Sequence, residues 1–103
     1  MIDIRETEHF SNWLSKLRDG IARARIAARI QRLAMGNPGD VRPIGEGLSE
    51  LRIDHGPGYR VYFVQHGAVL IILLCGGDKG SQSRDIRTAR QLARDLKDED
   101  HDC

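Results

Sequence analysis

The sequence predicts an α+β fold in which a small, mostly antiparallel β-sheet carries an N-terminal helical hairpin and a C-terminal helix. Changes in the spacing of apolar residues predict it. Apolar residues recur at helical spacing between residues 7 and 35, follow strand patterns between residues 48 and 75, and return to helical spacing after residue 81. The predicted order is β-α-α-β-β-β-α, and its linkers are too short to divide 103 residues into two domains.

The first elements are a short strand and two helices. Residues 1–5 alternate isoleucine with charged side chains, which is the period of a half-buried strand. Thr7 can cap a helix with one apolar stripe, formed by Phe10, Trp13, Leu14 and Leu17. A second helix is predicted over residues 21–35, between a break at Asp19-Gly20 and the turn residues 36–39.

Two strands then form a predicted antiparallel hairpin, over residues 48–53 and 59–65, joined by the turn-rich loop 54–58. Side chains alternate between the two faces of a strand. Pairing the more apolar faces places these residues against the helices: Leu51, Ile53, Val61 and Phe63. The opposite face then displays a polar group: Glu50, Arg52, Arg60 and Tyr62.

The last part of the chain is predicted to be a central strand and a helix. Residues 69–75 are an apolar run without alternation, ended by the glycine-rich segment 76–80. Ser81 or Ser83 can cap a final helix, whose apolar line is Ile86, Ala89, Ala93 and Leu96. We expect one domain over residues 1–97, followed by a mobile acidic tail over residues 98–103.

The formal net charge of +1 is a sum of unlike parts. The last nine residues hold five acids and one base, so residues 1–94 contain 15 bases and 10 acids, a charge of +5. Thirteen of the 16 bases are arginine, whose planar guanidinium suits bidentate contacts to phosphate. The body of the chain is therefore basic, which agrees with a nucleic-acid partner.

Several classes of protein are excluded by composition. The longest apolar run, residues 68–75, is too short to span a bilayer as a helix, and acids near the N-terminus argue against a secretion signal, so we expect a cytoplasmic protein. Two cysteines and four scattered histidines predict neither a disulfide framework nor a metal site. The segment 76–80 lacks the pattern of a nucleotide-binding loop, and no cofactor is expected.

Four segments together carry a family resemblance. They are the helical hairpin, the strand Gly-Leu-Ser-Glu-Leu-Arg-Ile, the return strand Gly-Pro-Gly-Tyr-Arg-Val-Tyr-Phe, and Leu-Leu-Cys-Gly-Gly-Asp-Lys-Gly before the helix start Ser-Gln-Ser-Arg-Asp-Ile. The combination resembles the RelE/ParE superfamily of bacterial toxins, and more narrowly its phage-derived "addiction module killer protein" branch, close to the HigB-type toxins. The resemblance implies a compact toxin encoded beside an antitoxin, most commonly one that cleaves messenger RNA on the ribosome.

The resemblance also implies catalytic residues. Arg60 matches the arginine of the Tyr-Arg-Val-Tyr segment, Glu50 and Arg52 match charged positions of the preceding strand, and Lys79 matches the basic residue of the last turn. RNA cleavage without a metal requires a proton acceptor and cationic stabilisation of a phosphorane. Arg60 and Arg52 would supply the charge, and Lys79 would stabilise it or protonate the leaving oxygen. Glu50 is the candidate base, and Tyr62 would stack on an RNA base or orient the substrate.

Further RNA contacts are expected from arginines of the helices, namely Arg25, Arg29 and Arg84. Ordinary structural roles stay open for all of these residues: a cross-strand ion pair on a solvated sheet, a turn lysine, a packed tyrosine and solvated helix faces. Several nucleases of the superfamily carry a catalytic Tyr or His near the C-terminal end. That region here is a helix without Tyr, followed by His101, so the identity of the base and the acid is left open.

The expected function is therefore the toxin of a type II toxin–antitoxin system, acting as a metal-independent, ribosome-dependent mRNA endonuclease that inhibits translation. One alternative is a ParE-like toxin that poisons DNA gyrase by binding and performs no chemistry. Another is a decayed toxin retained as a binding partner of its antitoxin. The expected partners are a helix-turn-helix antitoxin encoded by the adjacent gene, messenger RNA and the ribosome, with no membrane.

Overall fold

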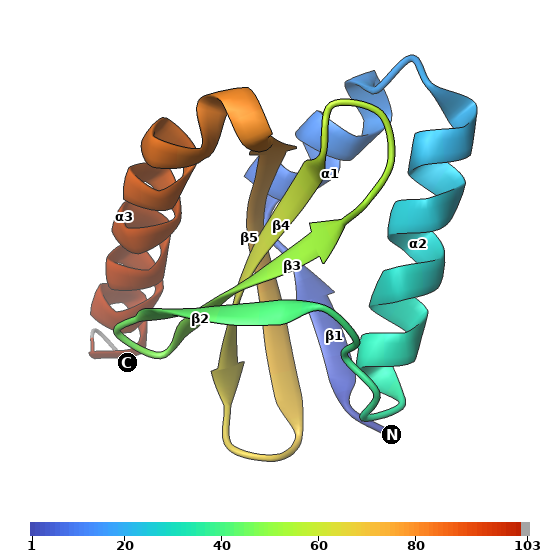
Figure 1. Cartoon of the computed structure of the whole chain (residues 1–103). Helices are drawn as coiled ribbons and strands as arrows, with labels where there is room; N and C mark the ends of the chain where they lie inside the picture. Colours follow the sequence, from blue (N-terminus) through green and yellow to red (C-terminus); the bar gives the residue numbers. More distant parts are fainter. Residues whose placement is uncertain (102–103) are drawn as a thin grey trace.

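The fold is a mixed β-sheet with helices on both faces, seen in a computed structural model that describes the backbone of residues 1–101 and the side chains of residues 1–98 (Figure 1). In chain order the elements are β1 (Asp3–Glu6), α1 (Glu8–Lys16), α2 (Gly20–Ala34), β2 (Val41–Gly45), β3 (Leu48–Ile53), β4 (Tyr59–His66), β5 (Leu70–Asp78), a 3-10 turn (Lys79–Ser81) and α3 (Gln82–His101). The strand order is β1-β5-β4-β3-β2. β1 runs parallel to β5 and the other neighbours pair antiparallel, so the predicted class is confirmed.

The helical hairpin begins and turns at side-chain caps. The Thr7 hydroxyl accepts a hydrogen bond of 3.1 Å from the Phe10 amide, as predicted, and donates one of 2.6 Å to the carbonyl of Leu74 on β5. Asp19, expected only as part of a break, caps α2 by accepting hydrogen bonds from the amides of Ile21 and Ala22. Each cap satisfies amides that have no partner inside their own helix.

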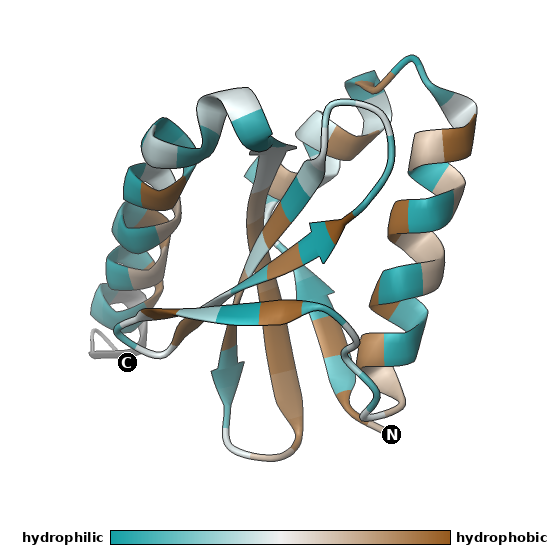
Figure 2. Ribbon diagram, viewed as in Figure 1, coloured by the Kyte–Doolittle hydropathy of each residue, from teal (hydrophilic) through white to brown (hydrophobic). Residues whose placement is uncertain are grey.

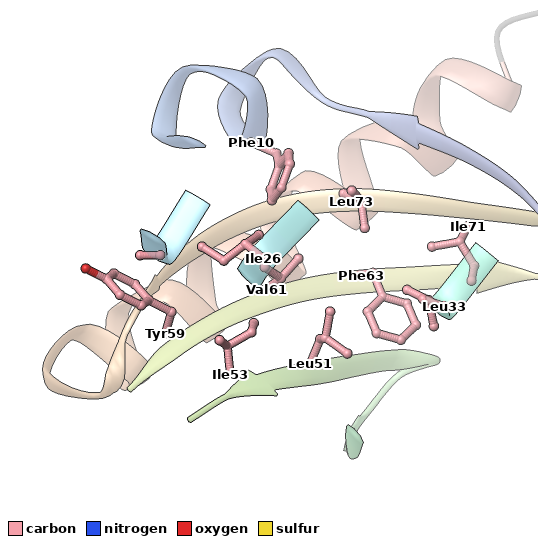
Figure 3. Close-up of a cluster of buried hydrophobic side chains, with 11 residues drawn as sticks. Phe10, Ile26, Leu33, Leu51, Ile53, Tyr59, Val61, Phe63, Ile71 and Leu73 are labelled. Atoms are coloured by element: carbon pink, nitrogen blue, oxygen red, sulfur yellow. The ribbon is translucent and has the colours of Figure 1, made fainter. Parts of the chain in front are cut away.

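One apolar core fills the space between this hairpin and the sheet. Ile26 and Leu33 of α2 point toward the strands (Figure 3). Apolar segments of α2 and of the strands, brown in Figure 2, face one another across the layer. The four strand residues predicted to face the helices all belong to this core, which confirms the predicted alternation: Leu51, Ile53, Val61 and Phe63. Burial of such side chains supplies most of the driving force for folding.

A second core lies on the other face of the sheet, beneath α3. It contains Leu48, Tyr62, Leu74, Cys75 and Ala89. Strand alternation predicted that this face displays Glu50 and Tyr62, and that prediction is wrong, because both side chains are completely buried. A β-bulge adds to the burial: Tyr62 pairs with Cys75 and Phe63 with Leu73, so Leu74 is the extra residue.

The strands and the last helix differ from the prediction in three places. β2 was not predicted; it is an edge strand containing Pro43, whose missing amide is tolerated at an edge. Residues 76–78 belong to β5 rather than to a turn. α3 continues past residue 97 to His101, while residues 102–103 lie outside the described chain, and the mobility of the acidic tail stays a prediction.

The end of β5 passes between α1 and α3, and the space there leaves no room for a side chain at Gly76 or Gly77. A Cβ atom on Gly76 would lie 2.7 Å from Cδ2 of Trp13 on α1, and one on Gly77 would lie 2.8 Å from Cγ of Asp85 on α3. Real Cβ atoms essentially never approach other atoms so closely. The two glycines therefore let α1 and α3 approach opposite sides of this strand just before Lys79.

Candidate functional site

Three of the four predicted catalytic residues line one polar pocket of about 560 Å³. Arg52 and Arg60 are directly paired across β3 and β4, and Lys79 follows the last residue of β5. The ends of these strands meet at the upper end of the sheet in Figure 1, beside the start of α3. The rest of the lining comes from two acids and the β3–β4 loop: Asp40, Asp54, Gly56, Pro57 and Gly58.

The position of Lys79 is set by a capped turn. The Asp78 carboxylate accepts hydrogen bonds from the amides of Gly80 (2.8 Å) and Ser81 (3.2 Å), and the Asp78 amide donates to the Ser81 hydroxyl. This reciprocal pattern is a capping box. Gly58 of the facing loop comes close enough that its Cβ would lie 3.5 Å from Cβ of Lys79. The lysine is therefore held at the pocket by its backbone while its side chain is exposed to solvent.

Glu50 lies behind the two arginines rather than in the pocket. It is completely buried, and its Oε1 atom is 3.5 Å from Nε of Arg60 and 3.8 Å from Nε of Arg52. Its Oε2 atom accepts a hydrogen bond of 2.7 Å from Nε2 of Gln82, the first residue of α3. Glu50 instead lines a neighbouring cavity of about 410 Å³ with Arg42. The carboxylate is thus placed to orient the arginines.

Two acids moderate the positive charge of the pocket. Asp40, which precedes β2, is 4.0 Å from Nε of Arg52. Asp54 lines the same pocket and is exposed, and it takes part in none of the ion pairs found among the described residues. Neither acid was predicted from the sequence, because their approach to the pocket depends on β2 and on the path of the β3–β4 loop. The result is a pocket with three cations and two carboxylates.

Tyr62 is not at a surface. Its side chain is completely buried beneath α3, and its hydroxyl has no hydrogen-bond partner among the described residues. Burial, reinforced by the charge of Glu50, raises the pKa of this hydroxyl above its ordinary value. Tyr62 therefore stays protonated, and in this arrangement its ring packs in the second core instead of being available to stack on an RNA base.

The helix arginines lie in different environments. Arg29 donates hydrogen bonds to the carbonyls of Arg52 (2.6 Å), Pro38 (2.9 Å) and Asp40 (3.3 Å), and burial lowers its pKa. Its guanidinium therefore joins α2 to the segments that flank the pocket. Arg25 is exposed on α2, and Arg84, 75% exposed, lies 3.8 Å from Asp85. The structure brings neither Arg25 nor Arg84 to the pocket of Arg52, Arg60 and Lys79.

Gln82 is the site residue that sequence reasoning missed most clearly. Its signal was its place at the start of the last helix, within the segment that carried the family resemblance.

Among the residues that the structure describes, no group of three His, Cys, Asp or Glu side chains could hold a metal ion. Within the same residues no helix is long and apolar enough to span a membrane.

Comparison with known proteins gives the family. Residues 12–97 match the family described as "Phage derived protein Gp49-like (DUF891)". The chain belongs to this Gp49-like family. The Gp49-like family is one of the RelE-like families of addiction module killer proteins, so the broader resemblance is confirmed. The narrower likeness to HigB-type toxins stays a prediction. An uncharacterized protein of Haemophilus influenzae strain Rd is 53% identical over 95 residues, which cover 92% of this chain and 96% of that relative.

Proposed function

We propose that this Gp49-like protein is the toxin of a type II toxin–antitoxin pair and cleaves messenger RNA on the ribosome. The observation that supports this proposal most strongly is the convergence of Arg52, Arg60 and Lys79 on one polar pocket. Three cations from three separate segments form a site for a phosphate group, because guanidinium and ammonium groups both donate charge-assisted hydrogen bonds to phosphate oxygens. Membership of an addiction module killer family agrees with this role.

The proposed chemistry is attack of an RNA 2′-hydroxyl on the adjacent phosphorus. The P–O2′ bond forms, the P–O5′ bond breaks, and the products are a 2′,3′-cyclic phosphate and a 5′-hydroxyl. Arg52 and Arg60 would stabilise the extra negative charge on the phosphorane. Lys79 would stabilise the charge that develops on the 5′-oxygen and donate the proton that converts this oxygen into the 5′-hydroxyl. These three residues are the proposed catalytic group.

The proton acceptor is assigned differently from the sequence-based hypothesis. Glu50 is completely buried behind the arginines. Its carboxylate forms ion pairs with Arg52 and Arg60 and accepts a hydrogen bond from Gln82. Asp54 is exposed at the pocket, so it is our candidate to accept the proton of the 2′-hydroxyl. Exchange of Asp54 for Asn should lower the rate of cleavage while leaving RNA binding in place.

The antitoxin is the second proposed partner. The basic body of the chain, with a charge of +5 over residues 1–94, favours an antitoxin that presents acidic side chains. We propose that it is a helix-turn-helix protein encoded by the adjacent gene. Co-expression of that gene should restore growth and yield a complex that copurifies with the toxin.

Primer extension on cellular mRNA after induction tests the function. The wild-type chain should produce cuts in phase with codons, and Lys79→Gln should abolish them, because Lys79 is an exposed turn residue whose loss leaves the core intact. Lys16→Gln, an exposed lysine in the last turn of α1, is the matched control. Intact transcripts together with broken DNA would instead identify a gyrase poison and overturn the nuclease proposal.

A further inference from the structure

We infer, on the basis of the proposed function, that Gln82 is a positioning residue: through Glu50 it fixes the directions in which Arg52 and Arg60 meet the RNA phosphate. Gln82 begins α3, which covers the face of the sheet that carries these residues. It would act without touching the RNA, because its amide is directed at Glu50.

The first step in the argument is the cost of burying Glu50. An ionised carboxylate removed from water must be compensated by charge and by hydrogen bonds. Glu50 bears this cost in full, because its side chain is completely buried. Arg60, which is 7% exposed, and the half-buried Arg52 supply the compensating charge. The three side chains therefore form one electrostatic unit on the face of the sheet that α3 covers.

The second step is that the arginines do not fix the orientation of the carboxylate. Both approach Oε1 of Glu50 through Nε, at 3.5 and 3.8 Å, and this oxygen has no hydrogen-bond partner among the described residues. Contacts of that length are attractive but weakly directional. The hydrogen bond of 2.7 Å from Gln82 to Oε2 is short and directional. Gln82 thereby sets the rotation of the carboxylate and, with it, the position of the charge that the arginines face.

The third step links the start of α3 to the whole pocket. The turn that carries Lys79 is closed by the Asp78 and Ser81 capping box and leads directly into Gln82. The packing of the start of α3 consequently has two effects. It positions Lys79 through the backbone of the turn, and it positions Arg52 and Arg60 through the contact between Gln82 and Glu50. Loss of the Gln82 amide would leave the cations present but misdirected.

The test uses Gln82→Met, which keeps the length and helix propensity of the side chain but removes its donor. Gln91→Met is the matched control, because Gln91 lies on the same helix and donates to the exposed Asp95. In the free, ¹⁵N-labelled full-length protein, Gln82→Met should shift the Nε–H signals of Arg60 and Arg52, whereas Gln91→Met should leave them unchanged. Unchanged arginine signals in Gln82→Met would overturn the inference.

A binding measurement then separates positioning from general destabilisation. A single-stranded 2′-O-methyl RNA, which cannot be cleaved, should bind Gln82→Met three- to ten-fold more weakly than wild type and bind Gln91→Met as wild type does. In a double-mutant cycle, Gln82→Met and Arg60→Lys should be coupled, and Gln91→Met with Arg60→Lys should be additive. Additivity of both pairs would contradict the link through Glu50.

Failure of the proposed function would look different. If Lys79→Gln and Arg52→Gln bound the RNA as tightly as wild type, the pocket would not be the RNA site, and the inference that Gln82 directs these arginines onto RNA would fall with it. The arginine signals of the free protein would then still report whether Gln82 orients Glu50. The two measurements therefore distinguish a wrong function from a wrong link.

Discussion

The guanidinium of Arg29 on α2 donates a hydrogen bond of 2.6 Å to the main-chain oxygen of Arg52 on β3. The same guanidinium donates to the carbonyls of Pro38 and Asp40, so one side chain joins the hairpin helix to both segments beside the pocket. The arginine that the charge pattern suggested as an RNA contact is thus already bound to the protein itself.

Replacement of Arg29 should therefore reduce stability more than replacement of its exposed neighbour. Arg29→Ala removes three hydrogen bonds from a charged donor, and we expect it to lower the free energy of unfolding by about 1–2 kcal/mol. Arg25→Ala should change it by less than about 0.5 kcal/mol. Urea denaturation of both variants measures the difference, and equal effects would show that the Arg29 contacts do not contribute to folding.

The closely packed end of β5 gives a second prediction. Gly76→Ala would place a methyl group against the ring of Trp13, a partly buried side chain that packs against the core beneath the helical hairpin. Overpacking of this kind costs about 1–3 kcal/mol. Gly20→Ala is the control, because Gly20 opens α2 and its Cβ would meet only the end of the Arg23 side chain at 3.6 Å. Thermal unfolding should show a lower midpoint for Gly76→Ala alone.

Asp19 predicts how stability responds to acid. Hydrogen bonds from the Ala22 amide and from His55 lower its pKa below the ordinary 3.8. A carboxyl group whose folded pKa is depressed contributes stability that is complete above its unfolded pKa and is lost as the pH falls through the folded value. Wild type should therefore lose thermal stability below about pH 4. Asp19→Asn keeps a capping oxygen without the charge, so its midpoint should fall less steeply between pH 5 and pH 2.5.

Cys75 should be inert in the folded protein. Burial, reinforced by the charge of Asp85, raises the pKa of its thiol to about 12, and the thiolate is the form that reacts. With Cys103 exchanged for Ser, Cys75 is the remaining thiol of the chain. A disulfide reagent at pH 8 should label it only at the rate of unfolding, and fast labelling without denaturant would contradict the burial beneath α3.

The sequence predicted the elements that repeat a period over many residues, and it missed those defined by their neighbours. Thr7 and the alternation of β3 and β4 were predictable because cap and strand patterns are local. β2 has five residues, including Pro43, and its apolar residues do not alternate, so only its pairing with β3 makes it a strand. Periodicity alone could not identify it.

The candidate site shows the same division. Alternation placed Glu50, Arg52 and Arg60 on one face, and the structure has them there. Whether that face is open depends on which side of the sheet α3 packs, and an amphipathic stripe does not contain that information. One signal existed: the unbroken apolar run in β5, typical of a strand buried on both faces. This run predicts that both faces of the sheet are covered at β5, which agrees with the position of α3.

The acidic end of the chain supports a last prediction, independent of its conformation. Residues 98–103 contain four acids, which lower the charge of a basic body and should repel RNA phosphates. Neutralisation of these acids as Asn or Gln should tighten RNA binding at low salt. The advantage should vanish near 1 M salt, where the Debye length is about 3 Å. A matched variant that neutralises Asp3, Glu6 and Glu8 at the other end of the chain is the control, because it raises the charge by a similar amount elsewhere. If both variants bound RNA equally tightly at low salt, net charge alone would explain the gain, and the C-terminal segment would have no specific influence on the site.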